Sequence, residues 1–320
     1  MLYLNENDIL KIGIDWNKTI DSIKEAVRCY RDKDYSQPIK PYLRYRDLKN
    51  RIIAMPAFLG GNFNISGIKW IASFPKNIES GKPRANSIII LNNANTGEVI
   101  SSINTSLIST IRTASVSGLV IKNYIKAGDK KDLTVGIIGW GPIGKNHFKM
   151  CQEILGDRVK QYYLYDIKGV DKGTLSDQEK NKTKVTDNWQ ETYQNADIFI
   201  TCTVSDERYI NREPKKGSLL LNVSLRDFKL DVYKYIKDNI IVDDWEEVCR
   251  ENTDIELFHK DCGLEKEQVK SISEVLEDKN YFTTTGSIMF NPMGMAIFDL
   301  AISKYYLDQA KQKNIGIILD

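Results

Sequence analysis

The sequence predicts an α/β protein that combines a doubly wound parallel sheet with a second, α+β domain. The chain has 320 residues, which is enough for about two domains. Its middle part alternates short apolar strands with helical or looped connections, a pattern typical of a parallel sheet. Its first third instead contains consecutive strand-like runs without helices between them. Two differently built domains are therefore expected.

The first domain is expected to begin with a helix and to continue with antiparallel strands. Apolar residues recur at helical spacing across 19–34. Further along, short β-branched and aromatic runs are separated by Gly, Pro and Asn breaks. These runs predict strands at Arg51–Met55, Ile65–Phe74, Ser87–Leu91 and Val99–Ile103, followed by a helix over Ser106–Lys126.

A charged loop around Asp129–Asp132 marks the start of the parallel sheet. Its predicted strands are Thr134–Gly139, Gln161–Tyr165, Asp197–Thr203, Ser218–Val223 and Asn239–Val242. The stretch 168–188 is polar, and we expect a shortened helix or a long loop there. A last helix is predicted over Pro292–Lys313, and we expect it to close the first domain. The predicted domains are thus 1–126 plus 290–320, and 127–289.

Composition excludes several functional classes. The 45 Lys and Arg residues nearly balance the 43 Asp and Glu residues, which gives no bulk electrostatic case for a nucleic-acid or membrane-surface partner. No apolar run reaches the roughly 18 residues of a membrane helix, and the first residues do not resemble a signal peptide, so we expect a cytoplasmic protein. With two histidines and no C-x-x-C pair among five cysteines, we expect no metal site.

A dinucleotide-binding fingerprint follows the first strand of the parallel sheet. The strand Thr134–Ile138 runs into Gly139-Trp140-Gly141-Pro142-Ile143-Gly144, a G-x-G-x-x-G motif, and a helical pattern continues to Leu155. The glycines would allow a tight turn, the approach of a pyrophosphate and close packing of helix on strand. Asp166 ends the next strand, where a carboxylate binds both ribose hydroxyls and repels a 2′-phosphate. We therefore predict a Rossmann-type domain that binds NAD rather than NADP; the alternative is a glycine-rich turn without a nucleotide.

Two cations stand alone in apolar surroundings. The window 52–74 has Lys69 as its one charged residue, and the window 99–121 has Arg112. A charge in such a setting is costly unless it is paired. One interpretation is that both side chains bind an anionic ligand such as an amino-acid carboxylate, with Arg as a bidentate clamp and Lys as a point contact or a proton-transfer group. The other is that each pairs with a distant Asp or Glu.

Several motifs resemble the ornithine cyclodeaminase/mu-crystallin family, and the resemblance covers nearly the whole chain. The motifs are Gly67–Ile71, Ser106–Ala114, Gly139–Gly141 and Asn291–Ala296. The family implies a homodimer in which the sheet of the first domain forms the interface, so that this domain both binds the substrate and dimerises.

The resemblance also implies roles for single residues. Arg44, Lys69 and Arg112 fall where the family places its substrate-carboxylate ligands. Asp227 falls where the cyclodeaminases have a catalytic aspartate. Three consecutive residues fall where the family's backbone lines the nicotinamide side of the cofactor: Thr203, Val204 and Ser205.

Within the family, the chain resembles the dehydrogenase branch that acts on N-(2-amino-2-carboxyethyl)-L-glutamate. The matching stretches are Lys40–Arg44, Arg51–Pro56, Thr201–Val204 and Val242–Trp245. This implies NAD-dependent oxidative cleavage of a secondary amine to 2-oxoglutarate and 2,3-diaminopropionate, a precursor of siderophores and antibiotics. Ile53 stands where cyclodeaminases carry a glutamate, which argues against ornithine deamination. The alternatives are a ketimine or imino-acid reductase, an amino-acid dehydrogenase, a cyclodeaminase, or a non-catalytic nucleotide-binding protein like the mu-crystallins.

Overall fold

The computed structural model describes residues 1–278, 280–283 and 285–320, and the chain divides into two compact units. Unit 1 consists of Met1–Ser115 and Gly294–Asp320, and unit 2 consists of Val116–Met293. The first boundary falls inside the helix α3 (Leu107–Lys126), which runs without interruption from one unit into the other. Unit 2 is therefore continuous in sequence and interrupts unit 1.

Unit 1 contains a mixed eight-stranded sheet in the order β16-β1-β7-β6-β5-β4-β2, with β3 also paired to β4. The strands β4 to β7 pair antiparallel in sequence order, as predicted. The chain's first strand, which the sequence did not suggest, pairs parallel with β7. The strands are β1 (Leu2–Asn5), β2 (Tyr35–Ser36), β3 (Tyr42–Leu43), β4 (Arg51–Leu59), β5 (Ile65–Ser73), β6 (Ala85–Asn93), β7 (Val99–Asn104) and β16 (Ile317–Ile318).

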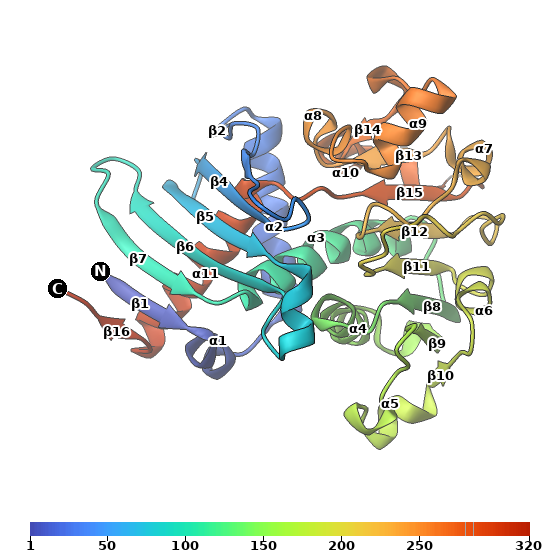
Figure 1. The fold of residues 1–320 in the computed structure, drawn as a ribbon, viewed down its shortest axis with the longest axis horizontal. Helices are drawn as coiled ribbons and strands as arrows, with labels where there is room; N and C mark the ends of the chain where they lie inside the picture. Colours follow the sequence, from blue (N-terminus) through green and yellow to red (C-terminus); the bar gives the residue numbers. More distant parts are fainter. Residues whose placement is uncertain (279, 284) are drawn as a thin grey trace. The chain divides into compact units, whose positions relative to one another are not determined.

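Helices cover one face of this sheet (Figure 1). The helices α1 (Glu6–Ile12) and α2 (Trp16–Arg31) pack against α11 (Ala296–Lys313), which lies across β4, β5 and β6. The prediction that the last helix starts at Pro292 is wrong by four residues. Gly294 has a φ of 89° and Met295 is extended, so the helix begins only at Ala296.

Unit 2 contains an eight-stranded, all-parallel sheet of the Rossmann type, in the order β10-β9-β8-β11-β12-β15-β13-β14. The five predicted strands are present. The sequence missed β15, which lies between β12 and β13 inside the sheet. The strands are β8 (Leu133–Ile138), β9 (Val159–Tyr165), β10 (Thr183–Val185), β11 (Ile198–Thr201), β12 (Leu219–Asn222), β13 (Ile240–Val242), β14 (Lys270–Ser271) and β15 (Ile288–Asn291).

The connections of unit 2 are short helices and loops. The polar stretch 168–188 contains a five-residue helix and the strand β10, so the expected shortened helix is correct but the strand was missed. No helix among the described residues is long and apolar enough to cross a membrane. The helices are α4 (Pro142–Leu155), α5 (Asp177–Asn181), α6 (Trp189–Gln194), α7 (Tyr233–Ile236), α8 (Trp245–Val248), α9 (Asp254–Cys262) and α10 (Ile272–Glu277).

Candidate active site

The turn after β8 contains the three glycines of the fingerprint. Gly139 has a φ of 96°, in the left-handed region that favours glycine, and a Cβ there would lie 2.4 Å from the carbonyl oxygen of Cys202. A Cβ on Gly144 would lie 1.9 Å from the carbonyl oxygen of Gly139. Close packing of the turn therefore requires the first and the third glycine.

Gly141 has a different environment. It caps α4 without a side-chain acceptor, and a Cβ there would meet no atom within 4 Å. Pro142 follows in the first helical turn, where its fixed φ suits the helix. A helix N-terminus with uncapped N–H groups beside open space suits an anionic phosphate. The turn, including Ile143, thus fits the pyrophosphate of a dinucleotide.

Asp166 lies beside this turn, directly after β9. Its Oδ2 accepts a hydrogen bond from the backbone N–H of Trp140 at 2.6 Å, and its Oδ1 accepts one from that of Lys168 at 2.8 Å. The carboxylate is therefore held next to the glycine turn while the residue stays partly exposed. An oriented carboxylate here can accept hydrogen bonds from ribose hydroxyls and disfavours a 2′-phosphate.

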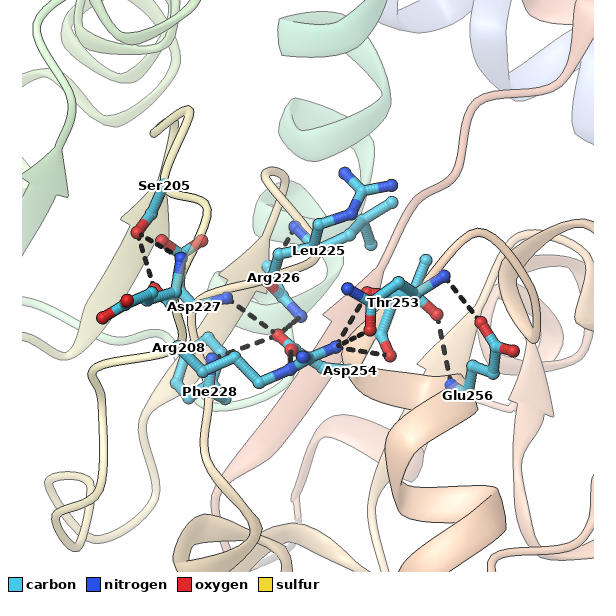
Figure 2. Close-up of polar contacts among 12 residues, drawn as sticks. Ser205, Arg208, Leu225, Arg226, Asp227, Phe228, Thr253, Asp254 and Glu256 are labelled. Carbon is cyan, nitrogen blue, oxygen red and sulfur yellow. Dashed lines mark hydrogen bonds and ion pairs between the residues drawn. The ribbon is translucent and has the colours of Figure 1, made fainter. Parts of the chain in front are cut away.

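Two further predicted groups meet at the carboxyl ends of the adjacent strands β11 and β12. Asp227, after β12, is completely buried, and the hydroxyl of Thr203, after β11, donates to its Oδ1 at 2.5 Å. The hydroxyl of Ser224 donates to its Oδ2. Figure 2 shows Asp227 and Ser205 in this region. Val204, between Thr203 and Ser205, is 61% exposed. The carboxyl ends of parallel strands are where such sheets bind ligands.

In unit 1, Lys69 and Arg112 contact the same carboxylate. Lys69 Nζ lies 2.8 Å from Oδ2 of Asp299, and Arg112 Nε lies 3.2 Å from Oδ1. All three side chains are buried, and Asp299 comes from the first turn of α11. The sequence left open whether each cation pairs with a distant acid, and the structure shows that both pair with one. A single carboxylate cannot neutralise two cations, so this cluster has a net positive charge.

The charges in this cluster shift one another's protonation. Burial lowers the pKa of Lys69 to about 8, with the Arg112 charge acting in the same direction and Asp299 opposing both. Burial alone would raise the pKa of Asp299, but the Arg112 and Lys69 charges hold it below its ordinary value. Asp299 therefore stays ionised, and Lys69 can exchange a proton near neutral pH.

Two residues next to the cluster were not predicted as site residues. The Nζ of the buried Lys40 donates to the carbonyl oxygen of Gly294 at 2.8 Å, and the Lys40 charge also lowers the pKa of Lys69. A Cβ on Gly294 would lie 2.5 Å from Nη1 of Arg112. Gly294 thus allows the guanidinium to lie directly against the backbone before α11.

The structure places Arg44 on the surface of unit 1. It is exposed, and its guanidinium carbon lies 5.1 Å from the ring centroid of Tyr42. The predicted site residues therefore form two groups. Unit 1 carries the cations, and unit 2 carries the glycine turn, Asp166, the Thr203–Ser205 segment and Asp227.

A sequence signal for Asp299 was present. Residues 281–303 form a third window of 23 residues with a single charge, which is Asp299. The criterion that singled out Lys69 and Arg112 would therefore also have identified their partner.

These features define a class. Unit 2 has the architecture of dinucleotide-binding α/β proteins. It contains a parallel sheet, a glycine turn at the N-terminus of a helix, an acidic residue after the next strand and a carboxylate beyond the carboxyl ends of the strands. The family model described as "Ornithine cyclodeaminase/mu-crystallin family" matches residues 8–314, and the chain belongs to this family.

Relatives extend the comparison over the whole chain. The N-((2S)-2-amino-2-carboxyethyl)-L-glutamate dehydrogenase of Staphylococcus aureus is 36% identical, over 100% of this chain and 98% of that protein. Among solved structures, the Δ1-pyrroline-2-carboxylate reductase of Thermococcus litoralis, in complex with NADH and L-proline, has a TM-score of 0.86 at 21% identity, with both chains covered completely. An archaeal alanine dehydrogenase dimer with bound NAD has a TM-score of 0.83 at 21% identity, covering 100% of this chain and 99% of that one. The two structures confirm the predicted fold class.

Proposed function

We propose that this protein is an NAD-dependent oxidoreductase that cleaves N-(2-amino-2-carboxyethyl)-L-glutamate. The products would be L-2,3-diaminopropionate and 2-oxoglutarate, with NADH formed. The observation that carries the proposal is the buried Asp227 carboxylate, held by two hydroxyls at the carboxyl ends of β11 and β12. The 36% identity to the Staphylococcus aureus enzyme along both chains supports this particular substrate.

The substrate has carboxylates that suit the cations of unit 1. Arg112 would bind one carboxylate with its Nη atoms, since Asp299 contacts its Nε. Lys69 would bind as a point charge, and its pKa of about 8 would let it exchange a proton with the substrate nitrogen. Arg44 would bind a further carboxylate from the surface segment after β3.

The chemistry requires an oxidation followed by a hydrolysis. When bound, NAD would supply a nicotinamide that accepts the hydride lost from the glutamyl Cα, and with it two electrons. Loss of this hydride and of the nitrogen-bound proton forms a C=N bond. Water then adds to the imine carbon, and Asp227 takes a proton from that water. The nitrogen takes back a proton as the water adds. When the C–N bond breaks, Asp227 returns its proton to the nitrogen and the added hydroxyl loses its own, which leaves the carbonyl of 2-oxoglutarate and the amine of 2,3-diaminopropionate.

The dinucleotide would be held by unit 2. Gly139, Gly141, Pro142, Ile143 and Gly144 would bind its pyrophosphate at the N-terminus of α4. Asp166 would bind the ribose hydroxyls and favour NAD over NADP. Thr203, Val204 and Ser205 would line the nicotinamide. The names of the two structural relatives, one with NADH and one with NAD, support this assignment.

We also propose a homodimer formed through the sheet of unit 1. Trp70 is 42% exposed on β5, and the residues paired with it on the neighbouring strands, Ala54 and Ile88, are apolar. A hollow of about 400 Å³ on this sheet is lined by Pro38, Pro56, Phe58 and Ile68, together with polar residues such as Ser66 and Asn92. An exposed apolar face of this kind is suited to an interface, and the archaeal relative is described as a dimer.

The test is to incubate the purified protein with NAD and synthetic N-(2-amino-2-carboxyethyl)-L-glutamate. NADH absorbance should rise, and mass spectrometry should identify both products in equal amounts. If the protein instead oxidises NADH while it reduces cyclic imino acids, and does not oxidise the proposed substrate, it is an imino-acid reductase. Tight NAD binding without turnover of any N-carboxyalkyl amino acid would identify a non-catalytic binding protein.

A further inference from the structure

Asp254 is a buried carboxylate in unit 2 that contacts the segment carrying Asp227. It is the first residue of α9, and its side chain is completely buried. Its Oδ2 accepts hydrogen bonds from the backbone N–H groups of Asp227 and of Phe228, both at 3.1 Å. Because the acceptor is a carboxylate, these bonds are stronger than those of a neutral group. The turn that carries Asp227 is thereby fastened to the start of α9.

Arg208 joins the same contacts (Figure 2). Its Nε donates to Oδ1 of Asp254 at 2.7 Å, and its Nη2 donates to the carbonyl oxygen of Thr253 at 3.0 Å. The residues after it, Tyr209 and Ile210, donate their backbone N–H groups to the carbonyl oxygen of Asp227 at 2.9 and 2.8 Å. Asp227 is therefore held through both its backbone N–H and its backbone carbonyl.

The turn between β12 and Asp227 has an unfavourable conformation. Leu225 has a φ of 66°, in the left-handed region that costs a non-glycine residue about 1–2 kcal/mol. Its carbonyl oxygen accepts from the N–H of Asp254 at 2.8 Å, and its own N–H donates to the side chain of Asn222 at 3.0 Å. The Nδ2 of Asn222 donates in turn to Oδ2 of Asp254 at 3.0 Å. Such strain persists when surrounding contacts fix it.

We propose that Asp254, together with Arg208, is a positioning residue that sets the orientation of the Asp227 carboxylate for proton transfer. The inference rests on the proposed function, since it takes Asp227 to be the proton acceptor. A buried ion pair is a weak source of stability, because desolvation offsets the attraction between its charges. Among the described residues, the hydrogen bonds of the Asp254 carboxylate go to the Asp227 turn, to Asn222 or to Arg208, which a role in orientation explains.

The first test is Asp254→Asn at a pH above the value of about 7 to which burial raises the pKa of Asp254, so that the wild-type carboxyl is ionised. The change keeps the shape but removes the charge and one acceptor oxygen. A displacement of a catalytic group by about 1 Å costs up to a hundredfold in rate, so we expect kcat to fall about tenfold to a hundredfold. The KM of the substrate and the Kd of NAD should change by less than about threefold. Backbone hydrogen exchange at 222–228 should accelerate in the cofactor-free protein. An unchanged kcat with unchanged exchange would overturn the proposal.

The matched control is Asp197→Asn at the other end of the sheet. Asp197 lies before β11, accepts from the backbone N–H of Thr134 at 2.9 Å and pairs with Lys215 at 2.6 Å. Like Asp254, it accepts a hydrogen bond from a backbone N–H and pairs with a cation, but it is 23% exposed and contacts the amino ends of the strands. An equal loss of kcat in both variants would mean that Asp254 has only a structural role. If Asp254→Asn fails to fold, Arg208→Gln replaces it, because Arg208 is partly exposed and Gln keeps one donor.

A double-mutant cycle separates this inference from the proposed function. In the Asp227→Asn background, Asp254→Asn should cause no further loss of kcat, because the group that it positions is already absent. A further loss of tenfold or more would overturn the positioning role. If Asp227→Asn alone retained full activity, the proposed role of Asp227 would fail, and the hydrogen-exchange result would still show whether Asp254 holds the turn.

Discussion

The two units hold buried charge in opposite ways. In unit 1, Lys69 and Arg112 share the single carboxylate of Asp299, so positive charge is in excess. In unit 2, the carboxylate of Asp227 is held by neutral hydroxyls, and the nearby cation Arg208 pairs with Asp254 instead. An excess of cations attracts an anionic ligand. The comparison supports our proposal that unit 1 binds the substrate and that Asp227 of unit 2 accepts the proton.

The largest effect is expected for Asp227→Asn. The amide cannot accept a proton, so kcat should fall about a thousandfold, within the range typical of general acid–base catalysis. The Kd of NAD, measured by fluorescence titration, should stay within about threefold. The control is Asp231→Asn, an exposed carboxylate four residues further on. Full activity of Asp227→Asn would show that Asp227 is not the proton acceptor.

Asp299→Asn tests the charge balance of unit 1. The change leaves two buried cations without their counter-ion, and removing one partner of a buried pair costs about 3–5 kcal/mol. Chemical denaturation should show this loss. Asp308→Asn is the control on the same helix, since its pair with Lys304 is more exposed and should contribute less than about 1 kcal/mol. A similar loss in the free energy of unfolding for the two variants would mean that Asp299 does not stabilise the buried cations Lys69 and Arg112.

Gly294→Ala tests how Arg112 is placed. The new Cβ would lie 2.5 Å from Nη1, so the guanidinium must move. We expect the KM of the substrate to rise about tenfold, as for the loss of about 1.4 kcal/mol of binding, with the Kd of NAD unchanged. Gly13→Ala is the control, because Gly13 has a φ of 86° but nothing within 4 Å of its Cβ position. An equal rise of KM in the two variants would show that backbone strain causes the rise and that the displacement of Arg112 does not.

The stability of the protein should also depend on pH. Burial lowers the pKa of His147 from 6.5 to about 4, so between these values the unfolded chain binds more protons than the folded one. The free energy of unfolding should therefore fall by about 2 kcal/mol as the pH falls from 6.5 to 5. Burial raises the pKa of Asp254 to about 7 and gives the opposite slope, with stability lost as the pH rises from 3.8 to 7.

The contribution of His147 is obtained from the difference between the unmodified chain and His147→Gln. Chemical denaturation of both across this pH range should show a steeper acid loss in the unmodified chain. His259→Gln, which leaves the buried imidazole in place, should behave like the unmodified chain. If the free energy of unfolding of His147→Gln and of the unmodified chain changed with pH in parallel, His147 would not be the source of the acid loss.

The sequence was sufficient to predict the fold class and most central strands, because their apolar runs are bounded by turn residues. It was not sufficient for β15, because Ile288–Asn291 leads directly into Pro292, where the last helix was expected to begin, and a short apolar run beside a predicted helix does not distinguish a buried strand from a helix. The predicted start of α11 was wrong because Gly294 has a positive φ and lies against the guanidinium of Arg112, a contact between residues far apart in the sequence that the local pattern does not reveal.

The candidate site was only partly predictable. Lys69 and Arg112 stood out because charges are scarce around them, and Asp299 would have stood out by the same measure. Asp254 could not be found in this way, since it lies in the charged stretch 250–256 and its burial arises from the packing of α9. The contact between Thr203 and Asp227 joins residues 24 positions apart, and it depends on the pairing of β11 with β12.

The most direct test of the central claim follows the hydride. The substrate is prepared with deuterium at the glutamyl Cα and incubated with the protein and NAD, and both products are analysed by mass spectrometry. We predict NADH that carries one deuterium and 2-oxoglutarate that carries none from this position. Formation of 2-oxoglutarate without deuterium in NADH, or no turnover while NAD is bound, would contradict the proposed oxidation.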